Sequence, residues 1–297
     1  MQRLFNNLLI TLSLPMGFTI LCIFCTVILG IIFRFSEAFH VRSSSIILVN
    51  YLSCVLIGVF WNGKILFHNF SSEWILWILG LGLCFVLGFN AFANSIRISG
   101  LPVAALFQKM SIILTVLAAL FLRDPINWIQ LIGWFIGIMG ISLAYAPKKD
   151  DRINRAELKY LFGTFLISSI IEIGFLLLNK QHFVNQEFHY TFPTFLFCAA
   201  ALFGMIGHFI SKQNLFISKQ EAFFGLALGL PNYFSIIFML KALENEWNGV
   251  IFFPVLNASV LILSALCGFF LFKDKLTKNQ IFAILLSTIS ILLISLF

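Results

Sequence analysis

The stretch LPVAALFQKMSIILTVLAALFL, residues 101–122, is matched 150 positions later by IFFPVLNASVLILSALCGFFLF, residues 251–272. Each stretch runs into a short charged turn, and Asp124 of the first turn aligns with Asp274 of the second. Another long apolar stretch follows each turn. The equal spacing and the two charged turns indicate an internal duplication, because apolar matches alone would be weak evidence in so hydrophobic a chain.

The composition indicates that the chain lies in a lipid bilayer. It has 297 residues, of which 60% are hydrophobic and only 10% are charged, and folding alone cannot hide that much apolar surface from water. A hydrocarbon layer about 30 Å thick needs roughly 20 apolar residues per helix. Runs of that length recur along the chain, and they are continuous rather than alternating, which favours helices. We therefore expect one polytopic membrane domain, residues 1–297.

Ten membrane spans are predicted, five in each half of the chain. Their expected ranges are 17–33, 43–61, 74–96, 101–122, 126–146, 158–179, 192–210, 222–243, 250–272 and 276–297. Repeat 1 covers 17–146, a basic linker covers 147–157, and repeat 2 covers 158–297. Because each repeat has an odd number of spans, the second copy is inverted relative to the first. The expected fold class is an all-α membrane protein with ten transmembrane helices as two inverted five-helix repeats, an architecture found in secondary transporters.

Basic residues are unevenly divided between the two sides of the membrane. The connections after the odd-numbered spans and the adjoining span ends hold thirteen Lys and Arg, whereas the opposite side holds five. The positive-inside rule then places the linker in the cytoplasm and both termini outside. Trp61, Trp74, Trp128 and Trp247 lie near the less charged side, as in an aromatic belt. The net charge of +7 lies mostly in short loops, which argues against a nucleic-acid partner.

The residue types of redox, metal and hydrolytic sites do not form recognisable patterns. All six cysteines lie inside apolar spans, where free Cys acts as a small hydrophobic residue. Cys22 and Cys25 have redox-motif spacing, but no βαβ pattern accompanies them. The histidines are scattered at span ends, and no HExxH or GxSxG pattern occurs. We expect no metal, no cofactor and no enzymatic activity.

Two ionisable residues fall well inside predicted spans, Lys109 in the fourth and Glu172 in the sixth. Burying either charge costs a few kcal/mol on insertion scales, so each needs a partner, water or a function. Their opposite signs make them natural partners. Two arrangements stay open: a closed ion pair that fixes helix register, or two charges that face a hydrated cavity.

Other polar residues repeat at helical spacing and predict a shared cavity. The candidate substrate-binding residues are Lys109, Glu172, Asn94, Arg97, Asn90, Gln108, Asn232, Tyr233 and Asn257, with Glu172 also the candidate proton carrier. Each Asn taken alone is also consistent with bonding to a neighbouring helix, and Arg97 with an interfacial anchor. Pro231 and Pro254 are candidate helix breaks beside the cavity. Small-residue spacing predicts close helix packing at Gly133, Gly137, Gly140, Gly225 and Gly229.

The repeat unit resembles that of the drug/metabolite transporter superfamily, in particular its EamA-like ten-helix branch. The matching features are a helix that ends in an acidic turn and then a Gly-rich helix, together with the region from Asn90 to Lys109. The resemblance implies inverted repeats around a cavity lined chiefly by spans 1, 3, 4, 6, 8 and 9. It implies that spans 5 and 10 support the cavity or form a homodimer. Relatives keep both termini in the cytosol, opposite to the orientation that the loop charges indicate.

The expected function is secondary transport of a small polar metabolite, amino-acid-like or another anionic or zwitterionic solute, by alternating access. Lys109, with Arg97 and the Asn stripe, would bind an anionic group. Glu172 would bind a proton or a cationic group of the substrate. The expected partners are a small-molecule substrate and the lipid bilayer, and the expected location is the bacterial inner membrane. A passive channel is the nearest alternative, and a membrane-embedded enzyme is the alternative of another class.

Overall fold

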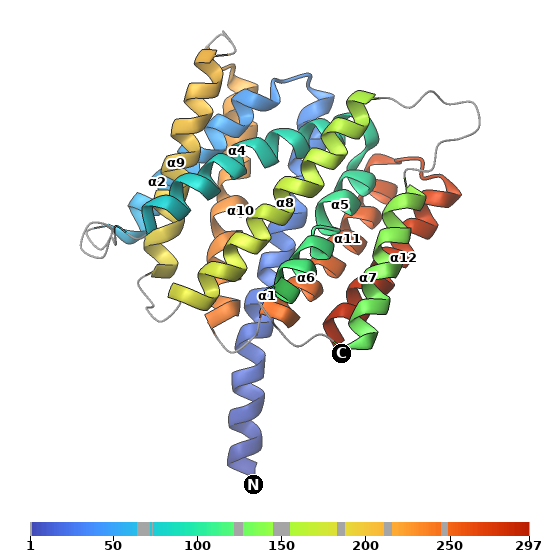
Figure 1. Ribbon diagram of the computed structural model, residues 1–297. Helices are drawn as coiled ribbons and strands as arrows, with labels where there is room; N and C mark the ends of the chain where they lie inside the picture. Colours follow the sequence, from blue (N-terminus) through green and yellow to red (C-terminus); the bar gives the residue numbers. More distant parts are fainter. Residues whose placement is uncertain are drawn as a thin grey trace.

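The computed structural model describes residues 2–63, 72, 74–121, 127–144, 155–182, 188–210, 216–244 and 249–296. Within these ranges every regular element is an α-helix (Figure 1). The helices are α1 (Gln2–Ala38), α2 (Ser43–Asn62), α4 (Trp74–Ser99), α5 (Leu101–Lys109), α6 (Ile112–Phe121), α7 (Trp128–Ala144), α8 (Arg155–His182), α9 (Phe188–Ile210), α10 (Lys219–Glu244), α11 (Gly249–Phe272) and α12 (Lys278–Leu296).

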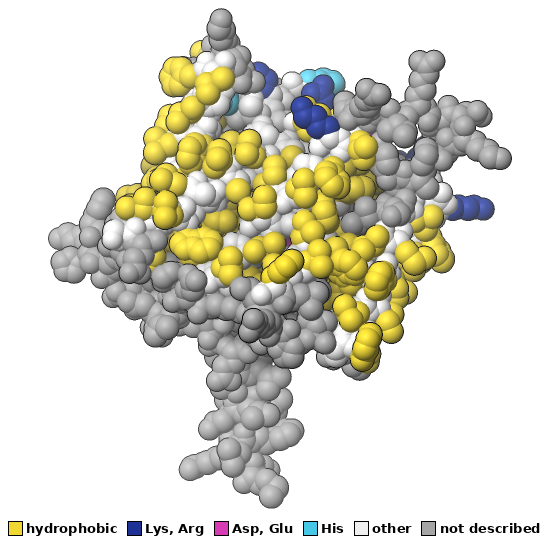
Figure 2. All heavy atoms as spheres, in the orientation of Figure 1, with side chains coloured by type: hydrophobic (Ala, Val, Ile, Leu, Met, Phe, Trp, Pro, Cys, Tyr) yellow, Lys and Arg dark blue, Asp and Glu magenta, His cyan; other side chains and the backbone are white. Residues whose placement is uncertain are grey.

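Seven of the described helices are long and apolar enough to cross a membrane. Shorter apolar helical stretches, Leu101–Thr115, Trp128–Gly140 and Lys278–Ile294, lie where the fourth, fifth and tenth spans were expected. Figure 2 shows hydrophobic side chains over most of the described surface on this face, with Lys and Arg visible in its upper part and at its right edge. These are the features of a multi-pass integral membrane protein.

The two ends of the bundle can be told apart by the chain's course. Both termini lie at one end, here called the terminal end, whereas α7 ends and α8 begins at the other, the linker end (Figure 1). At the terminal end, Trp61 and Trp128 are exposed as expected for an aromatic belt, but Trp74 is buried against Phe192. Trp247 and linker residues 147–154 lie outside the described residues.

Helices from the first half of the chain pack mainly on helices from the second half. α1 and α2 both pack on α10, and α8 and α9 both pack on α4. α5 packs on α11, α2 on α9, and α7 on α12. Every one of these contacts joins residues before position 145 to residues after position 154, so the two halves pack against each other.

The predicted glycine faces are used for packing inside the chain. α7 lies beside α12, where Ser290 Oγ donates to the Gly133 carbonyl at 2.6 Å, and a Cβ at Gly137 would lie 2.7 Å from the Ser290 hydroxyl. Gly225 and Gly229 of α10 likewise close against α2. The prediction of close helix packing is confirmed at both places. A homodimer through α7 and α12 stays a prediction and would have to use their exposed faces.

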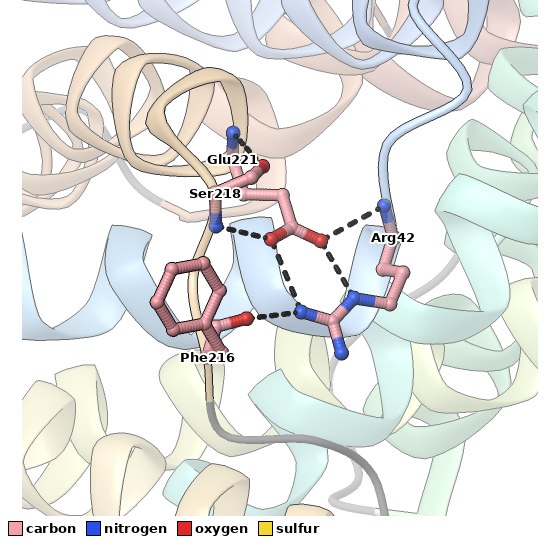
Figure 3. Close-up of polar contacts among 4 residues, drawn as sticks. All are labelled: Arg42, Phe216, Ser218 and Glu221. Carbon is pink, nitrogen blue, oxygen red and sulfur yellow. Dashed lines mark hydrogen bonds and ion pairs between the residues drawn. The ribbon is translucent and has the colours of Figure 1, made fainter.

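An ion pair joins α2 to α10 at the linker end (Figure 3). Arg42 Nε donates to Glu221 Oε1 at 2.7 Å, and Arg42 Nη2 donates to Glu221 Oε2 at 3.1 Å. The Ser218 backbone N–H donates to the same carboxylate at 2.8 Å, and Arg42 Nη2 also donates to the Phe216 carbonyl at 2.6 Å. The hydrogen-bonded Glu221 carboxylate raises the pKa of the Arg42 guanidinium. The Glu221 side chain is 4% exposed, so its charge depends on these donors.

A second set of polar contacts crosses between the halves at the same end. Arg34 of α1 donates to Asp274, in the turn between α11 and α12, at 2.8 Å, and it also pairs with Glu37. Ser99 of α4 donates to Glu157 of α8 at 2.8 Å. The linker end is therefore held together by several contacts that involve charged groups.

Candidate functional site

A cavity of about 140 Å³ lies within the bundle, bounded by α1, α4, α5, α8, α10 and α11. These helices correspond to the six spans that the family resemblance implied. Its polar residues include Gln108, Lys109, Ser168, Glu172 and Asn232, and its apolar wall includes Phe85, Phe89, Phe175 and Phe253. One water molecule needs only about 10–15 Å³ of such space. The cavity therefore has room for water or a small solute.

Lys109 and Glu172 face this cavity together. They are 6% and 9% exposed and lie close enough for their charges to interact. No N–O distance of 4.0 Å or less joins the two side chains, and Lys109 has no hydrogen bond or ion pair within the described residues. The structure therefore places two opposite charges on one cavity rather than in a closed ion pair.

Lys109 is the last residue of α5, at a break in the fourth predicted span. Residues 110 and 111 form a turn, and α6 begins at Ile112. Across the break, Ser111 N donates to the Gln108 carbonyl and Ile113 N to the Met110 carbonyl, so these hydrogen bonds reach three residues back instead of four. In a regular α-helix, each of these two N–H groups would donate to the carbonyl four residues back. At the break, those two carbonyls therefore do not receive these hydrogen bonds.

The position of this helix break differs from the expectation. Neither Gly nor Pro lies at positions 110 and 111, whereas α10 continues through Pro231 and α11 through Pro254. Contacts from α8 accompany the break instead, because Ser169 Oγ donates to the Ser111 carbonyl at 3.4 Å. Neighbouring helices can satisfy backbone groups at such irregularities inside a membrane protein.

Glu172 connects this break to a third helix. Asn257 Nδ2 of α11 donates to Glu172 Oε1 at 3.1 Å, and Thr115 Oγ1 of α6 donates to Oε2 at 3.4 Å. The Ser111 hydroxyl is a further hydrogen-bond donor beside the same carboxylate, whereas Asn257 Oδ1 is buried without a hydrogen-bond partner. Glu172 therefore lies where α6, α8 and α11 meet, at the edge of the cavity.

The other predicted substrate-binding residues fall into two groups, those that line or adjoin the cavity and those that do not. Gln108 and Asn232 line the cavity, and Asn257 adjoins it through Glu172. Tyr233 is fully buried, with its hydroxyl 3.3 Å from Thr194 Oγ1, and is not a lining residue. Because the Tyr233 side chain points toward α9, it does not reach the cavity, whereas the side chain of Asn232 does.

The polar stripe of α4 does not reach the cavity. Asn90 Nδ2 donates to the Val86 carbonyl at 2.8 Å, and Asn94 Nδ2 donates to the Asn90 carbonyl at 2.7 Å, so both amides bond back to their own helix. Arg97 is exposed near the linker end of α4. The same helix instead presents Phe85 and Phe89 to the cavity.

The sequence reasoning missed several residues beside the site. Cys22, Thr26 and Ser235 line the cavity, and Thr115 binds Glu172. Small hydroxyl and thiol groups in apolar helices give little signal, since they also occur as simple helix contacts. Thr115 lay four residues beyond Ser111 on the same helix face, a spacing that could have drawn attention to it.

Comparisons with known proteins support the fold and leave the function open. No family model matches the chain. It is 22% identical over 279 residues to an uncharacterized protein of Haemophilus influenzae, across 90% of this chain and 94% of that relative. A protein of known crystal structure matches with a TM-score of 0.67 and 11% identity, over 96% of this chain and 97% of its own. At that identity the likeness shows the fold alone.

Proposed function

We propose that this protein is a secondary transporter of the drug/metabolite transporter type, which moves a small anionic or zwitterionic metabolite by alternating access. The observation that carries the proposal is the pair of buried opposite charges, Lys109 and Glu172, on one cavity without an ion pair between them. Buried charges inside a membrane domain are costly and usually functional. An anionic group of the solute would bind Lys109, and Glu172 would take a proton or a cationic group.

Helix packing supports an arrangement of two inverted five-helix repeats. With α5 and α6 counted as one span, α1, α2 and α4 would correspond to α8, α9 and α10. The contact of α1 with α10 then corresponds to that of α8 with α4, and the contact of α2 with α10 corresponds to that of α9 with α4, and all four occur. The α7–α12 and α5–α11 pairs each join two corresponding helices, which would pack on each other across the symmetry axis. Inverted repeats of transporters are related in this way.

The location of the cavity supports alternating access. Phe253 lies in the second turn of α11, and Met239 lies in the last two turns of α10, so the cavity extends toward the terminal end. The Arg42–Glu221 and Arg34–Asp274 ion pairs join segments of the two halves at the linker end and would close that end in this conformation. This conformation would be the one that receives solute from the terminal end. Release at the linker end would require these helices to separate.

Solute counterflow tests the proposal. Small metabolites are first screened for those that raise the melting temperature of the purified protein, because a ligand that prefers the folded state stabilises it. The stabilising solute is then loaded into proteoliposomes, and uptake of the labelled solute against it is measured. Saturable counterflow supports a transporter. Flux that does not saturate and shows no counterflow would indicate a channel.

A further inference from the structure

A second pocket lies at the linker end, where α11 ends, the turn 273–277 follows and α12 begins (Figure 1). Its volume of about 390 Å³ falls within the roughly 300–1,000 Å³ range of small-molecule sites. The pocket shares no lining residue with the central cavity. One part of its lining is apolar and the other is charged: Phe269, Leu276 and Ile281, and Lys273, Asp274 and Lys275.

The charged part of this pocket is positive overall. Asp274 is turned toward α1, where its Oδ1 accepts a hydrogen bond from Arg34 at 2.8 Å, and Arg34 also pairs with Glu37. These three groups together leave one negative charge, which the two lysines outnumber. Lys273 and Lys275 are exposed, and neither has a hydrogen bond or ion pair within the described residues. Two unpaired ammonium groups at one pocket attract an anionic group.

The backbone of Lys273 is in the left-handed region, with a φ of 55°. Lys273 directly follows α11, and the next backbone N–H, that of Asp274, donates to the Gly268 carbonyl at 3.0 Å. Gly is the usual residue where a helix ends in this way, because a side chain is disfavoured in the left-handed region. A lysine at this position puts an ammonium group at the pocket despite local strain, and strain of this kind points to a function.

The apolar part of the pocket continues into the surface that faces lipid. Phe269 is 57% exposed and Ile281 is 49% exposed. Their neighbours Phe270, Leu271 and Phe282 are all more than half exposed. Large apolar side chains exposed at the end of a membrane helix contact acyl chains, and basic residues just beyond them lie at the level of the lipid headgroups. The pocket therefore spans the boundary between the hydrocarbon and the headgroups.

We propose that this pocket binds an anionic phospholipid of the leaflet at the linker end. The phosphate lies between Lys273 and Lys275, and the upper part of an acyl chain lies against Phe269 and Ile281. Basic pockets at the ends of membrane helices bind anionic headgroups in this way. The apolar part favours a lipid over free phosphate, and the lysines disfavour a headgroup that carries its own cation. This binding does not depend on the proposed transport function, because the pocket is separate from the central cavity.

The test is the melting temperature of the purified full-length protein in detergent, titrated with phosphatidylglycerol, phosphatidylcholine or inorganic phosphate at equal ionic strength. We expect a saturable rise with phosphatidylglycerol that the other two do not reproduce. Each lysine near a membrane surface contributes about 1 kcal/mol of attraction to anionic lipid, so Lys273→Gln with Lys275→Gln should raise the apparent dissociation constant about 30-fold. Lys159→Gln with Lys219→Gln is the matched control, because it removes the same charge from exposed lysines that do not line the pocket.

The outcomes distinguish a specific lipid site from general attraction to negative charge. A response to phosphatidylglycerol that is lost in the pocket variant and kept in the control variant supports the site. Equal stabilisation by phosphatidylglycerol and phosphatidylcholine overturns it, as does an equal response of the pocket variant and the control variant. Stabilisation by inorganic phosphate to the same extent as by phosphatidylglycerol would indicate a site for free anions, and it would overturn the assignment to lipid.

Discussion

Glu221→Gln is expected to open the cavity toward the linker end. The substitution keeps the shape of the side chain but removes the charge that holds both Arg42 nitrogens. Hydrogen bonds to charged groups contribute about 1.5–3 kcal/mol each, and the 38% exposure of Arg42 reduces this because exposed ion pairs are worth less. We expect a net loss of about 1–2 kcal/mol, which changes a population ratio about 5- to 30-fold.

Cys22 supplies the assay, because it lines the cavity. The other five cysteines are replaced by Ala, the protein is reconstituted in a known orientation, and a membrane-impermeant thiol reagent is added from one side at a time. Labelling from the linker side should become about 5- to 30-fold faster with Glu221→Gln, as the free-energy change implies. Lys219→Gln is the matched control, since Lys219 is exposed in the same helical turn. Unchanged labelling in Glu221→Gln would refute the reasoning.

Two further changes test the packing and the extent of the site. Gly229→Val should lower the unfolding free energy by about 1–3 kcal/mol, because the valine side chain would collide with Ser53 of α2. Thermal melts in detergent measure this loss. Gly207→Ala is the control, because a Cβ at Gly207 meets nothing within 4 Å. Asn232→Ala should weaken solute affinity severalfold, because Asn232 lines the cavity, whereas Asn94→Ala should not. Solute titrations of the melting temperature compare the two, and equal effects would contradict the assignment of the cavity wall.

Two properties of the sequence explain which structural features could be predicted from it: the length of its apolar runs and the energetic cost of burying a charge in lipid. Continuous apolar runs predicted membrane helices, and most helix positions follow them within a few residues. The meeting of Lys109 and Glu172 on one cavity followed from the cost of leaving either charge in lipid. Both predictions depend either on local composition or on a large energetic cost, so they could be made without knowing the tertiary contacts.

The features that were missed depend on which neighbour each helix face meets. The break at Met110 has no local signal, because contacts from α8 and the ends of the hydrogen-bond ladder accompany it rather than Gly or Pro. The stripe of Asn90 and Asn94 was correctly placed on one face, yet both amides are satisfied by their own helix. Helical periodicity shows that residues share a face without showing what that face contacts.

The most direct test of the central claim is counterflow of the stabilising solute at limiting concentration in proteoliposomes containing Lys109→Ala. Losing a buried charged contact costs about 2 kcal/mol or more, so flux per molecule should fall about 30-fold or further, while Lys219→Ala, at an exposed lysine, leaves it unchanged. Flux in Lys109→Ala equal to that of the wild-type protein would contradict the assignment of this cavity as the transport site.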